Sequence, residues 1–257
     1  MEIHSGNLGD VQRYIETHKH LGLEPHQRAY ENILRYVRSR REIGPRTRIL
    51  EIGTGTGWFP CLCKQNGLNC KGLEISTALI EHARQMGARY GIEPDIELGN
   101  LEDDRLGEES YDVIIASSVF EHVEFWRKGL ECAYRALTPG GALFFESTNK
   151  FSVTSGEWPA FPLYGWLPDR ARYQLRQWVH GKDIMQHGID FQQFRHAVLR
   201  RVFREVGFRE IHDRIDLVDP SEKRGWKRSM FAASKQVAPL KHVMLCFSPT
   251  TTFVCVK

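Results

Sequence analysis

The stretch Ile49-Leu-Glu-Ile-Gly-Thr-Gly-Thr-Gly-Trp58 decides the fold, because it joins an apolar strand to a glycine-rich turn. The apolar residues before position 53 predict a buried strand. Gly53, Gly55 and Gly57 then allow the backbone to turn tightly and to approach a ligand before a helix starts. A turn of this kind also occurs without a ligand, so the stretch alone leaves a purely structural role open.

An acidic residue just before the turn narrows the choice of ligand. Glu51 stands two residues ahead of the first glycine, where its carboxylate would repel the pyrophosphate of a dinucleotide. A ligand that carries an ammonium and a sulfonium group would be attracted instead. The G-x-G-x-G spacing also differs from the G-x-G-x-x-G spacing of dinucleotide sites. These residues favour S-adenosylmethionine over NAD.

Further apolar segments follow the turn and predict more strands. Cys70–Ser76 carries Glu74, which lies about 20 residues after Gly53, where the second strand of a βαβ unit presents an acid to a ribose. Residues 96–101 and 112–118 predict the next two strands. The turn Leu137-Thr-Pro-Gly-Gly141 ends a helical stretch, and the apolar run over 142–146 predicts a fifth, fully buried parallel strand.

Five segments together resemble class I S-adenosylmethionine-dependent methyltransferases, the group that includes ubiquinone-biosynthesis O-methyltransferases. The segments are LEIGTGTG at 50–57, GLEIS at 72–76, GNLED at 99–103, YDVIIASSVFEHV at 111–123 and LTPGGALFFESTN at 137–149. The resemblance implies an α/β, Rossmann-like fold with a seven-stranded, mostly parallel sheet and helices on both faces. Residues 208–217 would form the sixth strand, and residues 250–256 the final antiparallel strand.

The expected organisation is a single methyltransferase domain over 1–257, since 257 residues suit one large core. Within it we expect an N-terminal helical cap, a cofactor-binding core, a lid insert after the fifth strand and the C-terminal part of the sheet. These parts are residues 1–45, 46–149, 150–190 and 191–257. The sequence contains no apolar run of about 18 residues and no recognisable signal peptide. We therefore expect the chain in the cytoplasm, and peripheral contact with a membrane stays open.

The resemblance and the glycine turn together imply a binding site for S-adenosylmethionine, with S-adenosylhomocysteine as the product. Glu74 would accept hydrogen bonds from the ribose hydroxyls. The residues expected to bind the cofactor are Glu51, Gly53, Thr54, Gly55, Gly57, Glu74, Ile75, Asn100, Leu101, Glu102 and Ser117. Tyr14 and His18, in a predicted helix ahead of the core, are candidates for covering the cofactor, although an ordinary surface helix is an alternative for both.

His122 is the candidate general base if the acceptor is a hydroxyl. Glu121 and His122 could instead only orient the loop that follows the fourth strand. In ubiquinone-type relatives a further glutamate, three residues before the Glu-His pair, joins a divalent-metal site. That position is Ser118 here, so we expect no metal. The other histidines, such as His180, His187 and His196, are expected to be surface residues, and the six cysteines to be free thiols.

The insert after the fifth strand is rich in aromatic residues and proline between Trp158 and Pro168. We expect Trp158, Phe161, Tyr164 and Trp166 to form an apolar wall over the acceptor. A helix should follow, with Ala171, Leu175, Trp178 and Val179 on one face and Arg170, Arg172 and Arg176 around it. An amphipathic helix with tryptophan and arginine can also lie on a membrane interface, so the insert is expected to be a lid, a membrane contact, or both.

The charge is unevenly distributed along the chain. Residues 1–149 hold 17 Lys and Arg against 22 Asp and Glu, whereas residues 150–257 hold 18 against 10. A basic segment can be a solvated face, or it can favour an anionic substrate, a nucleic acid or an anionic membrane.

The leading expectation is O-methylation of a small hydroxylated, amphipathic or anionic molecule, such as a secondary metabolite, quinone precursor, lipid or glycan. A nucleic-acid methyltransferase is a weaker alternative, because no Asn-Pro-Pro-Tyr motif follows the fourth strand. A catalytically silent, cofactor-binding subunit is an alternative of another class. Nothing in the sequence indicates the oligomeric state.

Overall fold

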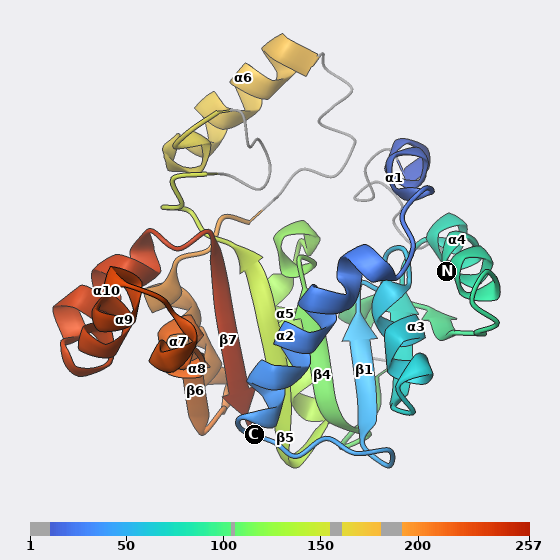
Figure 1. The fold of residues 1–257 in the computed structure, drawn as a ribbon. Helices are drawn as coiled ribbons and strands as arrows, with labels where there is room; N and C mark the ends of the chain where they lie inside the picture. The colour runs from blue at the N-terminus through green and yellow to red at the C-terminus, as the bar shows by residue number, and fades with distance from the viewer. Residues whose placement is uncertain (1–10, 104–105, 155–160, 181–191) are drawn as a thin grey trace.

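The fold is a seven-stranded sheet with helices on both faces, as expected for a Rossmann-like class I methyltransferase fold (Figure 1). The computed structural model describes residues 11–103, 106–154, 161–180 and 192–257. The strand order is β3-β2-β1-β4-β5-β7-β6. The first five strands are parallel, and β7 runs antiparallel to both β5 and β6. The strands are β1 (Arg48–Ile52), β2 (Asn69–Glu74), β3 (Asp95–Leu98), β4 (Tyr111–Ser117), β5 (Leu137–Thr148), β6 (Glu210–Asp213) and β7 (Thr250–Val256).

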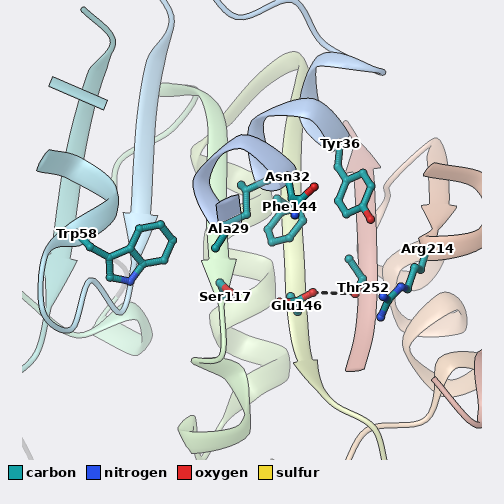
Figure 2. Close-up of a pocket in the computed structure, with 10 residues that line it drawn as sticks. Ala29, Asn32, Tyr36, Trp58, Ser117, Phe144, Glu146, Arg214 and Thr252 are labelled. Atoms are coloured by element: carbon teal, nitrogen blue, oxygen red, sulfur yellow. Dashed lines mark hydrogen bonds between the residues drawn. The ribbon is translucent and has the colours of Figure 1, made fainter. Parts of the chain in front are cut away.

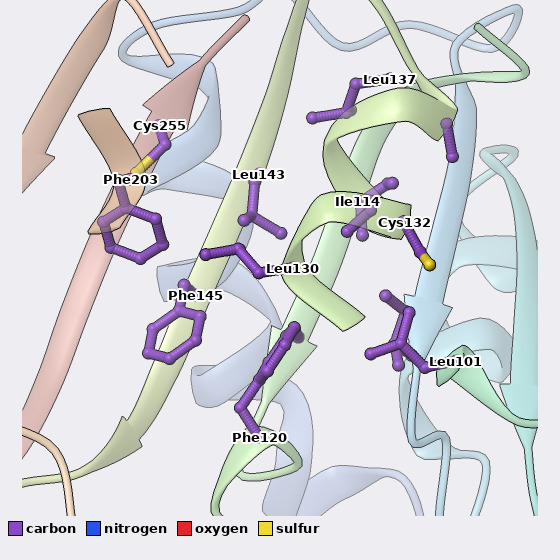
Figure 3. Close-up of a cluster of buried hydrophobic side chains, with 14 of the residues drawn as sticks. Leu101, Ile114, Phe120, Leu130, Cys132, Leu137, Leu143, Phe145, Phe203 and Cys255 are labelled. Atoms are coloured by element: carbon purple, nitrogen blue, oxygen red, sulfur yellow. The ribbon is translucent and has the colours of Figure 1, made fainter. Parts of the chain in front are cut away.

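Two hydrophobic layers hold the sheet between its helices. Central parallel strands are covered on both faces, which is why β4 and β5 consist of continuous apolar runs and do not alternate. One layer packs under α2 (Gln27–Arg38), α3 (Trp58–Gln65) and α4 (Thr77–Ala88), and includes Ile115 and Phe144. The other packs under α5 (Trp126–Ala136) and α7 (His196–Val206), and includes Leu143, Phe145 and Phe203 (Figure 3).

The helical prediction ahead of the core is confirmed. Two α-helices lie there, α1 (Val11–His18) and α2, joined through a short 3-10 turn, η2 (Glu24–His26). The apolar stripe of α2 is buried as its spacing predicts, and consists of Tyr30, Ile33, Leu34 and Val37. Each of these side chains is at most 6% exposed. α2 therefore packs against β5 and covers that part of the sheet.

The predicted sixth strand is too long. β6 ends at Asp213, and residues Arg214–Leu217 form a short helix, α8. Asp213 caps that helix, because its carboxylate accepts hydrogen bonds from the backbone N–H groups of Ile215 and Asp216. The Asp216 carboxylate accepts a hydrogen bond from the backbone N–H of Asp213 in return. This reciprocal capping box turns the chain into a helix where periodicity alone predicts strand.

Two other strand bounds also differ from prediction. β3 stops at Leu98 and is followed by a 3-10 turn, η3 (Leu101–Asp103), where the sequence predicts strand as far as Leu101. β5 begins at Leu137, so that the Pro-Gly-Gly turn lies inside its span, with an irregular register against Tyr111 and Val113 of β4.

The described part of the insert forms a 3-10 turn, η5 (Tyr164–Trp166), and a helix, α6 (Asp169–His180). Trp158 lies outside the described residues. Arg172, expected on the outer side of this helix, is instead fully buried. Its guanidinium carbon lies 5.9 Å from the Tyr164 ring centre and 5.1 Å from that of Tyr173. A planar guanidinium stacks well on aromatic rings, which explains the burial and removes Arg172 from contact with lipid headgroups.

His196 is likewise buried and not on the surface as predicted. Its ring Nε2 lies 3.2 Å from the Ser248 hydroxyl, and burial lowers the pKa of His196 to about 4. The side chain of His180, and all of His187, fall outside the described residues. All six cysteines are free thiols, as predicted, and five of them are buried.

Two helices, α9 (Trp226–Gln236) and α10 (Ala238–Cys246), precede β7, which lies between β5 and β6 in the sheet. In the part of the chain that the structure describes, no helix combines the length and the apolar character needed to cross a membrane.

Candidate active site

The glycine turn lies at the carboxyl end of β1 and leads into α3. Gly53, Gly55 and Gly57 have φ values of 69°, 57° and 78°, a region in which other residues are strained. A Cβ atom at Gly57 would lie 2.4 Å from the Ala83 Cβ of α4, so close helix packing requires glycine there. A Cβ at Gly55 would meet only the Tyr14 hydroxyl, at 3.6 Å. The backbone at Gly55 is therefore open to a ligand on the side that Tyr14 covers.

Glu74, at the end of β2, holds the glycine turn through its carboxylate. One oxygen, Oε2, accepts a hydrogen bond from the Gly55 N–H at 2.7 Å. The other, Oε1, accepts from the N–H groups of Ile75 and Ser76 at 2.9 and 3.1 Å. Burial raises the pKa of Glu74, and these three backbone donors oppose the rise. These hydrogen bonds therefore fix the Glu74 carboxylate beside Gly55 in the ligand-free protein.

Glu51 is the most unusual group at this edge of the sheet. Its side chain is 4% exposed, and its Oε2 atom has no hydrogen-bond partner among the residues that the structure describes. Burial raises the pKa of Glu51 well above its ordinary value, and the nearby Cys63 and Glu74 add to the rise. A buried, unpaired carboxyl oxygen is costly unless a donor arrives with a ligand. The ammonium group of S-adenosylmethionine supplies such a donor, so the residues present fit this cofactor.

Replacing Glu51 by glutamine should stabilise the ligand-free protein at neutral pH. Because the folded-state pKa is raised, the native protein binds more protons than the unfolded chain above the unfolded carboxyl pKa, so wild-type stability falls as pH rises. We expect the variant to have a Tm a few degrees higher near pH 8, at about 2–4 °C per kcal/mol, and almost no advantage near pH 4. Thermal unfolding across this range measures the difference. A Tm gap that does not grow with pH would contradict the prediction.

Tyr14 of α1 lies over the turn. Its ring packs against that of His18, with centres 4.1 Å apart and the ring planes tilted by 32°, and Tyr14 is 44% exposed. Burial of the hydroxyl raises the pKa of Tyr14, and the negative charges of Glu74 and Glu51 raise it further. Tyr14 is therefore close to both acids. A role for Tyr14 and His18 in covering the cofactor stays a prediction.

The remaining predicted cofactor residues meet at the same edge. Asn100 and Glu102 stabilise the loop after β3, because the Asn100 side-chain oxygen accepts a bond from the Glu102 N–H at 2.9 Å. Glu102 Oε1 accepts from the Phe125 N–H at 2.6 Å and so connects this loop to the start of α5. Leu101 is buried beneath them, and Thr54 is buried beside Gly72 of β2. Hydrogen bonds thus hold the loop after β3 against the start of α5.

A cavity of about 230 Å³ adjoins this edge, between α2 and the sheet (Figure 2). Its lining residues are Ala29, Asn32, Ile33, Tyr36, Trp58, Ser117, Phe144, Glu146, Arg214 and Thr252. Glu51 pairs in register with Ile115, two residues before Ser117, so these side chains lie on one face of the sheet. In Figure 2, Trp58 lies at one end of the cavity and Arg214 at the other. We call this cavity the α2 pocket.

Glu146, an acid near the carboxyl end of β5, is oriented by two threonines of β7. Its Oε2 accepts hydrogen bonds from the hydroxyls of Thr252 at 2.9 Å and Thr250 at 3.4 Å. The residues that the structure describes offer no hydrogen bond to Oε1. Glu146 therefore presents one carboxylate oxygen, held in a fixed plane, to the pocket. Glu146 is not among the residues predicted from the sequence, although an acid at the carboxyl end of a buried strand is a recognisable signal.

His122 is in a 3-10 turn, η4 (Phe120–His122), and is half-buried. It does not line the α2 pocket. Its neighbour Glu121 lines a smaller cavity of about 80 Å³ together with Ser147. Glu121 Oε2 accepts a hydrogen bond from the Ser147 hydroxyl at 2.5 Å, and burial raises its pKa. Among the described residues no cluster of three or more potential metal ligands occurs. A catalytic role for His122 stays a prediction.

The described aromatic residues of the insert do not line the α2 pocket. Tyr164 is fully buried, and its hydroxyl donates to the Arg172 carbonyl at 3.2 Å. Trp166 stacks on Phe247, with ring centres 5.9 Å apart, and donates through Nε1 to the Ser152 carbonyl. Phe161 packs edge-on against Tyr164. An aromatic wall over the acceptor therefore also stays a prediction.

Comparison with known proteins gives a consistent family. A methyltransferase-domain family model matches residues 25–213, which is most of the chain. The chain is 24% identical over 151 residues to a ubiquinone biosynthesis O-methyltransferase of Hahella chejuensis, covering 54% of this chain and 63% of that relative. It is 31% identical over 108 residues to a probable S-adenosylmethionine-dependent methyltransferase of Mycolicibacterium smegmatis, covering 42% of this chain and 40% of the relative. The chain therefore spans less than two thirds of the length of these curated relatives.

A solved structure supports the same fold. A S-adenosylmethionine-dependent methyltransferase from Mesorhizobium loti matches with a TM-score of 0.58 at 20% identity, covering 92% of this chain and 100% of that chain. At this identity the match establishes the architecture and leaves the acceptor open.

Proposed function

The chain belongs to the methyltransferase-domain family and has the class I S-adenosylmethionine-dependent fold, and on that premise we propose that it methylates a small hydroxylated molecule bound in the α2 pocket. Bound S-adenosylmethionine supplies an electrophilic methyl group on its sulfonium. Glu51 and the glycine turn would hold the amino-acid end of the cofactor, and Glu74 its ribose.

Glu51 supports this function most directly. A carboxyl group that is 4% exposed, with one oxygen unpaired, is a cation site that the free protein leaves unsatisfied. Gly55 lies beside it with an open backbone face, and Glu74 is already fixed against that backbone. A dinucleotide pyrophosphate would meet two acids here, so the charge favours a cationic cofactor over NAD.

The α2 pocket supports O-methylation through the position of Glu146. The acceptor oxygen would bond to the methyl carbon as the carbon–sulfur bond breaks, and Glu146 Oε1 would take the hydroxyl proton. Ser117, on the neighbouring strand, lies between this carboxylate and the glycine turn. Methyl transfer needs little covalent help, so orientation and exclusion of water by α2 should supply most of the rate.

The pocket size favours a small acceptor. Its volume of about 230 Å³ lies below the range of about 300–1,000 Å³ that is usual for drug-sized ligands. This supports a metabolite-sized substrate over a nucleic acid. One observation supports contact with an anionic membrane. Trp178 and Val179 of α6 are 84% and 46% exposed, as expected for apolar side chains that meet a membrane interface.

A labelled-methyl assay tests the function. The purified chain is incubated with methyl-labelled S-adenosylmethionine and fractionated extract of the native source, and binding of S-adenosylhomocysteine and NAD is measured by calorimetry. We expect S-adenosylhomocysteine but not NAD to bind, and label to enter a small-molecule fraction. Binding without any transfer would support a silent cofactor-binding subunit, and transfer into RNA or DNA would contradict the small acceptor.

A further inference from the structure

We infer that Arg214 and Tyr36 form an anion-binding subsite at the end of the α2 pocket away from the glycine turn, so that the acceptor carries a carboxylate or phosphate group. This inference rests on the proposed function, because it assigns the chemical class of the molecule that occupies the same pocket. Both residues line the cavity, one from α8 and one from α2.

Arg214 is left without a counter-charge because the two nearest acids in the sequence have other partners. Asp213 is 1% exposed and pairs with Arg200, and with Lys241 at 3.0 Å. Asp216 pairs with Lys241 at 2.6 Å and lies 3.7 Å from Arg200. These two acids and two cations balance each other. Arg214 forms no ion pair and no side-chain hydrogen bond with the residues that the structure describes, and none joins it to Glu146.

The capping box directs Arg214 toward the pocket. Asp213 ends β6 and starts α8, so Arg214 is the first helical residue, next to the edge of β7. Figure 2 shows its side chain reaching toward Thr252, with the Tyr36 ring from α2 on the facing side of the pocket. The Tyr36 hydroxyl is likewise without a hydrogen bond to the described residues. A half-buried guanidinium and a tyrosine hydroxyl that line one end of the same pocket are a donor set suited to carboxylate or phosphate oxygens.

The spacing of the strands sets the length of the acceptor. Ser117, Glu146 and Thr252 pair across β4, β5 and β7. Neighbouring strands lie about 4.8 Å apart, so the β4 and β7 ends of this row are separated by roughly 10 Å. Ile33 and Phe144 give the middle of the pocket apolar walls. A flat, apolar body with a hydroxyl at the β4 end and an anionic group at the β7 end matches this arrangement, as in a hydroxylated aromatic acid or aryl phosphate.

Matched probes test the subsite. With S-adenosylhomocysteine present, calorimetry compares 3,4-dihydroxybenzoate, its methyl ester and 4-hydroxyphenyl phosphate on the wild type, Arg214→Gln, Tyr36→Phe and Arg209→Gln. We expect the wild type to bind at least one anionic probe roughly 10- to 100-fold more tightly than the neutral ester. Arg214→Gln should lose most of that preference, Tyr36→Phe a smaller part, and the exposed control Arg209→Gln none. The carboxylate and phosphate probes show which anion is preferred.

The outcomes separate this inference from the proposed function. If S-adenosylhomocysteine binds but no anionic probe exceeds the ester, or if Arg214→Gln keeps the full preference, the anion subsite is wrong and the methyltransferase function stands. If S-adenosylhomocysteine does not bind, the proposed function itself fails. Unchanged S-adenosylhomocysteine affinity and Tm in Arg214→Gln show that a lost preference does not come from misfolding.

Discussion

Replacing Glu146 by glutamine should lower kcat for methyl transfer by about 10²- to 10⁴-fold, the usual contribution of a positioned acid or base. Glutamine keeps the shape and can still accept hydrogen bonds from Thr250 and Thr252, so the pocket should remain intact. Only the ability to take a proton is lost. Affinity for S-adenosylhomocysteine should be unchanged, because the residues proposed to bind it, Glu51 and Glu74, lie on other strands.

Three controls make this result specific. Glu210→Gln removes an exposed acid on β6 and should leave kcat unchanged. Thr252→Val removes the shorter of the two bonds that orient Glu146, and should reduce kcat less than Glu146→Gln. The deficit of Glu146→Gln should shrink for an acceptor analogue whose hydroxyl is already ionised at the assay pH. An equal deficit for neutral and ionised acceptors would make Glu146 a structural residue, and His122→Ala would then be the next variant to assay.

The sequence predicts which residues meet at the proposed cofactor site, because the determinants of their position are local. Each of Glu51, Gly55 and Glu74 lies within a few residues of a strand end, and parallel strands bring their carboxyl ends to one edge. The seven-stranded, mostly parallel sheet and its antiparallel last strand also followed from the resemblance. The glycine spacing, the acid before it and the acid on the next strand are therefore sufficient to predict that these residues lie at one edge of the sheet, without any knowledge of packing.

The acceptor half could not be predicted in the same way, because it is assembled from distant segments. The residues that line the α2 pocket come from α2, β4, β5, β7 and α8, among other segments. No local sequence motif specifies that these elements meet. The position of Arg214 at the pocket could not be predicted, because the sequence predicts a strand over residues 208–217 and Arg214 instead begins the helix α8. The spacing of Asp213 and Asp216 did contain a capping-box signal that would have ended the strand earlier.

Burial of polar side chains was the other source of error. Helical periodicity places Arg172 on an outer face, but it cannot show that Tyr164, eight residues earlier in the insert, covers that face. His196 begins α7 and is buried against Ser248 and Phe253, which come from the far end of the chain. Each partner is identified only by the tertiary structure.

Replacing Glu74 by alanine should weaken S-adenosylhomocysteine binding by about 2–4 kcal/mol, or roughly 30- to 1,000-fold. Two charge-assisted bonds to the ribose would be lost, and the ribose hydroxyls would be left unpaired. The structure adds a second cause. Glu74 Oε2 also accepts a bond from the Gly55 N–H, so the substitution releases the turn that contacts the rest of the cofactor.

Glu74→Gln separates these two causes. A glutamine oxygen can still accept the Gly55 bond, but the side chain carries no charge and can accept from fewer donors, so it should recover part of the affinity that alanine loses. Glu97→Ala, on the neighbouring strand β3, removes an exposed acid whose one ion pair within the described residues is with Lys71, and it should not change binding. Calorimetry with S-adenosylhomocysteine measures all three variants. If Glu74→Ala bound as tightly as the wild type, the ribose would have to lie elsewhere, and the unpaired carboxyl of Glu51 would need another cationic ligand.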